Sequence, residues 1–225
     1  MIELKAVHKV FNQDQPNETW AVKGVDLIIP DRRMTVLKGP SGSGKTTLLT
    51  LIGCLARPSS GRVRIGDKDV SSFPERFLAD VRRRTFGFVF QNFNLLRGIS
   101  VLENVMVPAY PLGTPRKALS DTAYGLLERL GIADKAHVRA ELLSGGEAQR
   151  AAIARAMINS PSVLIADEPT ANLDTALSAD VLGIFADLKA EGTTLVMSSH
   201  DPLVWQSDAA DHVVSMRDGM VSETD

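Results

Sequence analysis

The stretch Gly39-Pro40-Ser41-Gly42-Ser43-Gly44-Lys45-Thr46 decides which fold this chain can adopt. It fits the pattern G-x-x-x-x-G-K-[ST] of the P-loop, a glycine-rich turn that joins a strand to a helix. The apolar run at 34–37 predicts the buried strand before the turn, and residues 47–55 predict the helix after it. Glycines let backbone N–H groups converge on phosphate oxygens, and the helix N-terminus adds partial positive charge. The stretch therefore predicts a nucleoside triphosphate site.

Two side chains of this turn have specific expected roles. Lys45 would reach the β- and γ-phosphates, and the Thr46 hydroxyl would be a ligand of Mg²⁺. The residues predicted to surround the phosphates are Gly39, Ser41, Gly42, Ser43, Gly44, Lys45, Thr46 and Thr47.

The rest of the chain predicts one α/β domain over residues 1–225. Residues 2–11 and 22–29 alternate apolar and polar side chains, which indicates antiparallel strands beside the P-loop strand. Residues 92–113 are apolar but show no strand period, and residues 116–130 have helix spacing. A further helix is predicted to begin at Ser144. We therefore expect a helical subdomain at about 92–158, inserted into the α/β core.

Composition limits the environment and the partners of the chain. The net charge of −2 gives no bulk attraction to nucleic acid, so we expect no nucleic-acid partner. Cys54 is the single cysteine, which excludes an internal disulfide. The N-terminus has no signal-peptide pattern, and no apolar run reaches the roughly 18 residues that span a bilayer. We expect a soluble, cytoplasmic protein whose membrane role, if it has one, needs a separate chain.

Three predicted strands end in polar residues that suit phosphate chemistry. Asp167 and Glu168 follow the run at 163–166, Gln91 follows 86–90, and His200 follows the strand at 194–197. In an open parallel sheet, ligands bind beyond the carboxyl ends of the strands, where the P-loop must also lie. Asp167 suits the Mg²⁺ site opposite Thr46, and Glu168 is the candidate general base for the attacking water. Gln91 could bind Mg²⁺ or that water, and His200 could donate a hydrogen bond to the γ-phosphate.

A second candidate anion site is Leu143-Ser144-Gly145-Gly146-Glu147, at the start of the predicted helix. Its glycines expose N–H groups, and Ser144 offers an N-cap hydroxyl. Because this stretch is remote in sequence from the P-loop, and each occurs once, we expect a site completed between two chains.

Together these motifs resemble the nucleotide-binding subunits of ABC transporters over essentially the whole chain. The residues that carry the resemblance are the P-loop at 39–46, Gln91, the signature at 143–147, Asp167 with Glu168, Asn172-Leu173-Asp174, and His200. The resemblance implies a P-loop NTPase (RecA-like) core and head-to-tail homodimers that hydrolyse ATP with Mg²⁺. In such dimers Ser144 to Gly146 of one chain cap ATP on the P-loop of the other, with Glu147 and Asp174 in the same nucleotide-binding set. Phe11 sits where the family has its adenine-stacking aromatic, and Trp20 is the rival.

Finer features are similar to the lipoprotein-releasing and macrolide-exporting (LolD/MacB-like) branch. They include the loop at 12–19 and the stretches 88–96 and 102–105. The branch implies an ATPase at the cytoplasmic face of the inner membrane, bound to separate transmembrane permease chains. The apolar segment 93–107 is expected to contribute to the groove for that partner. Transport and a purely mechanical role in the cell envelope both stay open. The other readings are a soluble ABC-type ATPase of DNA repair or translation and a P-loop kinase or GTPase.

Overall fold

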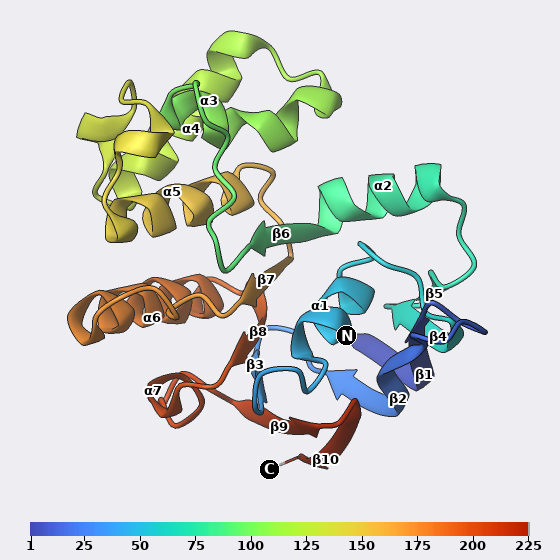
Figure 1. The fold of residues 1–225 in the computed structure, drawn as a ribbon. Helices are drawn as coiled ribbons and strands as arrows, with labels where there is room; N and C mark the ends of the chain where they lie inside the picture. Colours follow the sequence, from blue (N-terminus) through green and yellow to red (C-terminus); the bar gives the residue numbers. More distant parts are fainter. Residues whose placement is uncertain (225) are drawn as a thin grey trace.

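The strands form two separate sheets in the computed structural model, which describes residues 1–224 (Figure 1). The larger sheet has six strands in the order β10-β9-β3-β8-β7-β6. Neighbouring strands from β9 to β6 run parallel, and β10 pairs antiparallel with β9. The strands are β3 (Met34–Lys38), β6 (Phe86–Val89), β7 (Val163–Asp167), β8 (Thr194–Ser199), β9 (His212–Arg217) and β10 (Met220–Thr224).

The smaller sheet is antiparallel, in the order β2-β1-β4-β5. Its strands are β1 (Ile2–Phe11), β2 (Thr19–Ile29), β4 (Ser60–Ile65) and β5 (Lys68–Asp69). The expectation that the first two strands lie beside the P-loop strand is wrong. Both edges of β3 are paired with the parallel strands β8 and β9, so β1 and β2 pair with each other and pack their apolar face on the core instead.

The helices fall into two groups along the chain. Helix α1 (Lys45–Ile52) follows the P-loop, α2 (Glu75–Thr85) precedes β6, and α6 (Thr175–Ala190) and α7 (Pro202–Trp205) flank β8. Between β6 and β7 lie α3 (Val101–Met106), α4 (Arg116–Arg129) and α5 (Gly145–Met157), with short 3₁₀ helices at Val107–Leu112, Ala133–Lys135 and Ala140–Leu142. The α/β fold class with an antiparallel sheet is confirmed, whereas the subdomain boundary at 92–158 stays a prediction.

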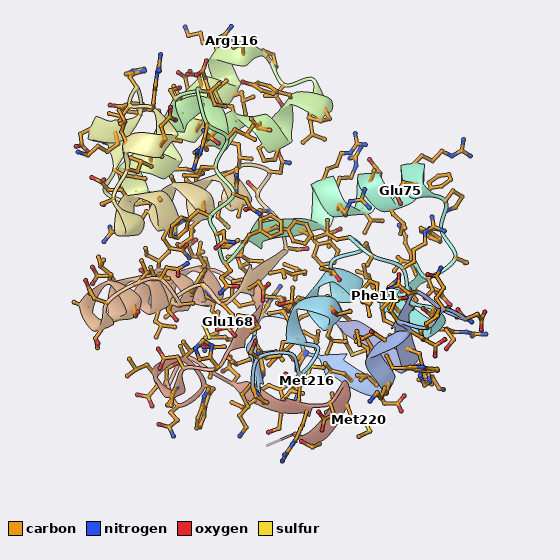
Figure 2. The ribbon with its side chains drawn as sticks, viewed as in Figure 1. Phe11, Glu75, Arg116, Glu168, Met216 and Met220 are labelled. Atoms are coloured by element: carbon orange, nitrogen blue, oxygen red, sulfur yellow. The ribbon has the colours of Figure 1, made fainter. Side chains whose placement is uncertain are left out.

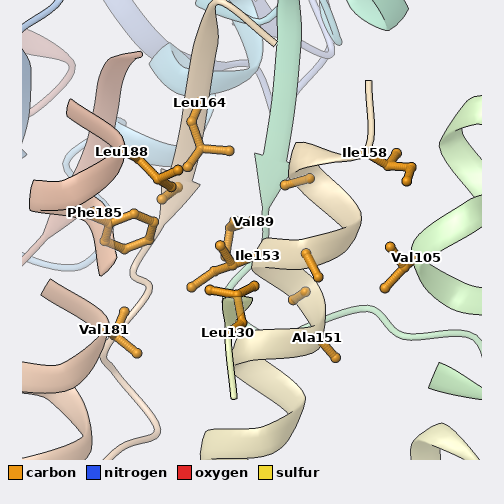
Figure 3. Packing of buried hydrophobic residues seen from close by; sticks show 14 of the residues in the cluster. Val89, Val105, Leu130, Ala151, Ile153, Ile158, Leu164, Val181, Phe185 and Leu188 are labelled. Atoms are coloured by element: carbon orange, nitrogen blue, oxygen red, sulfur yellow. The ribbon is translucent and has the colours of Figure 1, made fainter. Parts of the chain in front are cut away.

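The parallel sheet is buried on both faces, which explains why its strands read as continuous apolar runs. On β3, Met34 and Val36 belong to the core cluster shared with α3 to α6, whereas Leu37 belongs to the cluster shared with α1 and the antiparallel sheet. Figure 3 shows α5 between α6 and α3, with Ile153 near Val89 of β6. Because helices and the second sheet cover both faces, the strand ends are left as the place for a ligand. Within residues 1–224, no helix has the length and apolarity to cross a bilayer.

Candidate active site

The carboxyl ends of β3, β6, β7 and β8 meet at one pocket of about 470 Å³. Each of these strands is followed directly by a polar segment, so the parallel topology collects the segments at one edge of the sheet (Figure 1). The lining residues are Thr19, Trp20, Ala21, Lys23, Ser41, Gly42, Ser43, Gly44, Lys45, Thr46, Thr47, Gln91, Glu168, His200, Asp218 and Gly219. The P-loop and three of the predicted catalytic positions therefore share one pocket.

The backbone of the P-loop is pressed between two strands. Gly39 has φ 155°, and a Cβ atom there would lie 2.2 Å from the Met216 carbonyl oxygen of β9. Gly44 has φ 101°, and a Cβ atom there would lie 2.4 Å from the Ala21 carbonyl oxygen of β2. Any larger residue at either position would push the loop off these strands. The two sheets thus clamp the turn that the sequence motif predicts.

The polar groups inside the turn fit a bound phosphate chain. The Lys45 Nζ donates hydrogen bonds to the carbonyls of Gly39 (2.7 Å) and Pro40 (3.1 Å), which lie within the loop. The buried Ser43 Oγ has no hydrogen-bond partner among the described residues. A buried hydroxyl without a partner is costly, and a phosphate oxygen would satisfy it.

Asp167, at the end of β7, faces the P-loop as predicted. The Thr46 hydroxyl donates a hydrogen bond of 3.0 Å to Asp167 Oδ1, and the Ser198 hydroxyl donates one of 2.6 Å to the same oxygen. Thr46 and Asp167 together offer hydroxyl and carboxylate oxygens, the ligands that Mg²⁺ takes when nucleotide phosphates supply others. The donor set therefore fits the predicted ion.

Glu168, labelled in Figure 2, is the carboxylate shared by two ion-pair contacts, with Lys45 and His200. Its side chain is mostly buried, one carboxylate oxygen is 3.6 Å from Lys45 Nζ, and the other is 2.9 Å from His200 Nδ1. The backbone at Glu168 is left-handed, with φ 47°, and its N–H donates to the Ser198 hydroxyl. This turn directs the carboxylate back toward the P-loop instead of into a continuing strand.

Gln91 lines the same pocket from the end of β6. Its backbone carbonyl accepts a hydrogen bond of 3.1 Å from the Asn172 side-chain amide. Asn172 precedes α6, so this contact joins the segment after β6 to the segment after β7.

The two candidate aromatic residues are both half-exposed but have different surroundings. Trp20 lines the pocket, and its indole N–H donates to Glu18 while its ring meets the His8 ring edge-on. Phe11 does not line the pocket, but it pairs directly with Thr19, which does. Figure 2 shows Phe11 on the antiparallel sheet. The two positions are neighbours across β1 and β2, and the stacking role of Phe11 stays a prediction.

The predicted signature turn lies at a different pocket, of about 390 Å³. Ser144 and Glu147 form a capping box: the Ser144 hydroxyl accepts from the Glu147 backbone N–H, and the Glu147 carboxylate accepts from the Ser144 backbone N–H. The hydrogen bond that the carboxylate accepts from the Ser144 N–H is the main cause that holds the pKa of Glu147 below its usual range. Gly146 and Lys135 line the same pocket, and none of its lining residues lines the P-loop pocket.

Asp174 also lies away from the P-loop pocket. Its carboxylate accepts a hydrogen bond of 2.9 Å from the Leu177 N–H, so within one chain it is the N-cap of α6. The structure thus brings together the P-loop, Gln91, Asp167, Glu168 and His200, and leaves the signature turn and Asp174 apart from them.

Sequence reasoning missed a residue behind the pocket and part of the pocket wall. Ser198 is buried and bonds both Asp167 and the Glu168 backbone, and the sequence did not predict this role, although Ser198-Ser199 directly precede His200 at the end of a strand. Lys23 and the β9–β10 turn line the pocket itself, and the Lys23 N–H donates to the Gly219 carbonyl. These residues come from distant parts of the chain and belong to no local motif, so only the packing of the two sheets reveals them.

Comparison with known proteins gives the family. Residues 22–171 match the family described as ABC transporter. The macrolide export ATP-binding/permease protein MacB of Rhodospirillum rubrum is 43% identical over 223 residues, which cover 99% of this chain and 34% of that protein. An uncharacterized ABC transporter ATP-binding protein, YknY of Bacillus subtilis, is 41% identical, with 98% of this chain and 95% of that protein covered. The chain therefore spans about a third of the length of the MacB relatives and nearly all of the shorter ones.

Solved structures agree with this result. The dimeric structure of the bacterial ABC transporter cassette MJ0796 matches with a TM-score of 0.92 and 33% identity, and covers 100% of this chain and 98% of that one. A second dimeric structure of MJ0796, in a post-hydrolysis state bound to ADP and Pi, matches with a TM-score of 0.91, again at 33% identity and with the same coverage of both chains. With its P-loop, the carboxylates of β7 and the capped signature turn all present, this chain belongs to the ABC transporter family and is an ATPase cassette similar to those of the MacB branch.

Proposed function

We propose that the chain works as a homodimer in which each ATP lies between the P-loop of one copy and the signature turn of the other. The observation that carries the proposal is the separation of the two anion sites, because the pocket around Ser144 and Gly146 shares no lining residue with the P-loop pocket. The N-terminus of α5 presents backbone N–H groups that suit a phosphate. No P-loop residue lines its pocket to hold that phosphate from the other side. A second copy would bring the two half-sites together, and the similar cassette MJ0796 has a dimeric structure.

The groups around the P-loop suit attack of water on the γ-phosphorus. Glu168 would accept a proton from the water as the new P–O bond forms. The bond between the γ-phosphorus and its bridging oxygen would break, leaving ADP and inorganic phosphate. His200, 2.9 Å from the Glu168 carboxylate, would orient that base and donate to a γ-phosphate oxygen. Lys45 would exchange its carbonyl partners for phosphate oxygens. Ser144 and Gly146 of the second copy would close the site against bulk water.

The Mg²⁺ ion would be held by Thr46 and Asp167, with Gln91 at the margin of the same pocket. When bound, it would polarise the phosphate oxygens and offset their negative charge. The chain's own contribution is the pair of oxygens set 3.0 Å apart, from Thr46 at the start of α1 and Asp167 at the end of β7.

The work of the dimer would be delivered to a transmembrane permease, in keeping with relatives named as macrolide export ATP-binding/permease proteins. We place the dimer at the cytoplasmic face of the inner membrane, in contact with transmembrane permease chains. Export or lipoprotein release is the leading function. Mechanical transmission across the envelope, without transport, is the alternative.

A carboxyl-to-amide substitution tests the catalytic proposal. Glu168→Gln removes the proton acceptor but keeps the size of the side chain. We expect it to bind ATP as the parent does, to lose at least a hundredfold in turnover, and to accumulate as a dimer with ATP. ATP hydrolysis and light scattering after size-exclusion chromatography measure these effects.

The matched control is Glu191→Gln, which changes an exposed carboxylate paired with Arg129 at the end of α6. It should keep parental turnover and stay monomeric with ATP. Hydrolysis by Glu168→Gln at the parental rate would remove Glu168 from the base position, and a monomer with ATP would refute the shared site.

A further inference from the structure

The segment Gln91–Leu96 has a backbone that its own sequence does not favour. It lies between the end of β6 and the start of α3, outside regular secondary structure. Phe93 and Asn94 are both left-handed, with φ of 58° and 50°. Asparagine tolerates this region, whereas phenylalanine rarely enters it. Contacts from elsewhere in the fold must therefore hold the segment in place.

Arg155 supplies the strongest of these contacts. Its guanidinium donates one hydrogen bond to the Phe93 carbonyl, at 2.5 Å, and another to the Asn94 carbonyl. The side chain is only 9% exposed, and burial lowers the pKa of its guanidinium. Among the described residues, no carboxylate forms a salt bridge with it, so the two carbonyls are the polar partners of a buried cation. The planar fork of arginine suits two neighbouring carbonyls, which lysine cannot engage in the same way.

The position of Arg155 in the fold gives this contact a consequence. Arg155 is in the last turns of α5, and the first turn of the same helix carries the Ser144–Glu147 capping box. Helix α5 is packed between α3 and α6 (Figure 3), and its backbone hydrogen bonds join its two ends. A displacement of the segment that Arg155 holds would therefore be passed along α5 to the signature turn.

Two further side chains hold the segment at its ends. The buried Asn104 of α3 accepts from the Leu96 N–H at 2.6 Å and donates to the Leu96 carbonyl at 3.0 Å. Asn172 donates to the Gln91 carbonyl. Of these contacts, only Arg155 ties the segment to α5.

We infer that Arg155 is a positioning residue that couples Gln91, in the nucleotide pocket of its own copy, to the signature turn that closes the site of the other copy. The inference rests on the proposed function, since the signature turn acts only in the dimer. Loss of the guanidinium would leave ATP binding at the P-loop intact, because its two hydrogen bonds go to Phe93 and Asn94 and Arg155 does not line the P-loop pocket. It would misplace the signature turn and Gln91 together, which lowers the rate of closure and of turnover.

The test compares Arg155→Met, Arg155→Lys and Asn159→Ala. Asn159 lies just after α5 and also donates to two carbonyls, of Arg83 and Pro108, so it is a matched control that does not touch the segment. We expect Arg155→Met to lower kcat at least tenfold, with ATP affinity of the monomer within twofold of the parent. In a Glu168→Gln background, it should raise the ATP concentration for half-maximal dimerisation at least tenfold. Arg155→Lys, which keeps the charge and one hydrogen bond, should fall between the parent and Arg155→Met.

The outcomes separate this inference from the proposed function. Circular dichroism and thermal unfolding check that each variant is folded, and Arg155→Lys carries the test if Arg155→Met does not fold. If the unsubstituted chain hydrolyses ATP and its Glu168→Gln form dimerises, but the folded Arg155 variants match these two proteins in kcat and in dimerisation, the inference is overturned alone. Equal losses in Asn159→Ala would also overturn it, because they would show a general effect of weakening α5. If the unsubstituted chain does not hydrolyse ATP and its Glu168→Gln form does not dimerise, the proposed function fails first and the inference with it.

Discussion

Single residues in the pocket are held by partners that a nucleotide would have to replace. Lys45 is buried, donates to two carbonyls of its own loop, and lies 3.6 Å from the Glu168 carboxylate. A charge removed from water is costly unless it is paired and hydrogen-bonded. Lys45 would therefore move to the phosphates only if their oxygens accept hydrogen bonds at least as favourable as those of the two carbonyls. Its movement would free the Glu168 carboxylate to accept a hydrogen bond from the attacking water.

The identity of the base-stacking residue is decided at this scale. Phe11 is 45% exposed and pairs with Thr19 of the pocket wall, and residues directly opposite in a sheet share a face. Trp20 lines the pocket, but Glu18 and His8 already hold its indole. We expect Phe11→Ala to weaken ATP binding about tenfold, since stacking on a base contributes about 1–3 kcal/mol. Trp20→Ala is the matched comparison. Calorimetric titration with ATP measures both, and a larger loss for Trp20→Ala would assign the stacking to Trp20.

The buried thiol of Cys54 gives a prediction about pH. Burial raises the pKa of Cys54 to about 11 from its ordinary 9.0. The folded protein binds this proton more tightly, so the contribution to stability is complete below pH 9 and is lost as the pH rises toward 11. We expect the unfolding free energy of the parent, relative to Cys54→Ala, to fall by about 1 kcal/mol for each pH unit in that window. Denaturant titrations at pH 8, 9, 10 and 11 measure it, and parallel curves for the two proteins would contradict it.

At the scale of elements, the segment Gln91–Leu96 connects the nucleotide pocket with the surface. Its side chains divide by exposure: Leu95 packs against the core cluster of the helices, whereas Leu96 is 50% exposed. Backbone groups of Leu96 are fixed by Asn104, so its side chain is presented in a defined direction. Leu96 is an exposed apolar side chain of the segment 93–107, which is predicted to meet a membrane partner, so it is a position at which that contact can be tested.

We therefore expect Leu96→Glu to release the chain from membranes of its own cells while leaving ATP affinity unchanged. A carboxylate at a packed contact costs several kcal/mol in lost burial and desolvation, enough for a loss of association of about a hundredfold. Ile28→Glu, at a similarly exposed position on β2, is the control and should stay membrane-bound. Co-sedimentation with membrane vesicles and nucleotide titration measure the two properties. Equal sedimentation of Leu96→Glu and the parent would contradict this partner surface.

At the scale of the whole molecule, the P-loop and the signature turn lie at two pockets that share no lining residue, and the proposed function makes each of them half of a site. A complementation experiment follows from this. Lys45→Ala should disable the P-loop and leave the signature turn intact. Gly145→Asp should do the reverse, because its carboxylate would repel the γ-phosphate while its Cβ has ordinary contacts of 3.8 Å. Each variant alone should lose hydrolysis, and a mixture should regain it in mixed dimers that hold one complete site.

The control for this mixture is Gly125→Asp, which adds the same charge to α4 at a position with open space around it. It should keep parental hydrolysis. The rate of ATP hydrolysis as a function of the mixing ratio is the measurement. A mixture no more active than its two components would argue that each copy completes its own site.

Sequence patterns predicted most of the elements and their chemistry because the signals are local. The P-loop pattern, the apolar runs that became β3, β6, β7 and β8, and the helix start at Ser144 each depend on neighbours within a few residues. The polar residues at the strand ends could be assigned to one edge, since parallel strands all end on the same side. The position of Gln91, Glu168 and His200 around the P-loop followed from that rule.

What only the tertiary structure decided depends on contacts between distant residues. The strands β1 and β2 lie in a second sheet because β8 and β9 pair with both edges of β3. No local sequence pattern indicates which strands pair with β3. The clamp of two strands on the P-loop, the Ser198 bonds to Asp167, and the grip of Arg155 on the carbonyls of a left-handed turn all join segments that are remote in sequence. Hydrogen bonds and close packing act over a few ångströms of space regardless of separation along the chain, so the sequence determined which groups were available and the fold determined which of them meet.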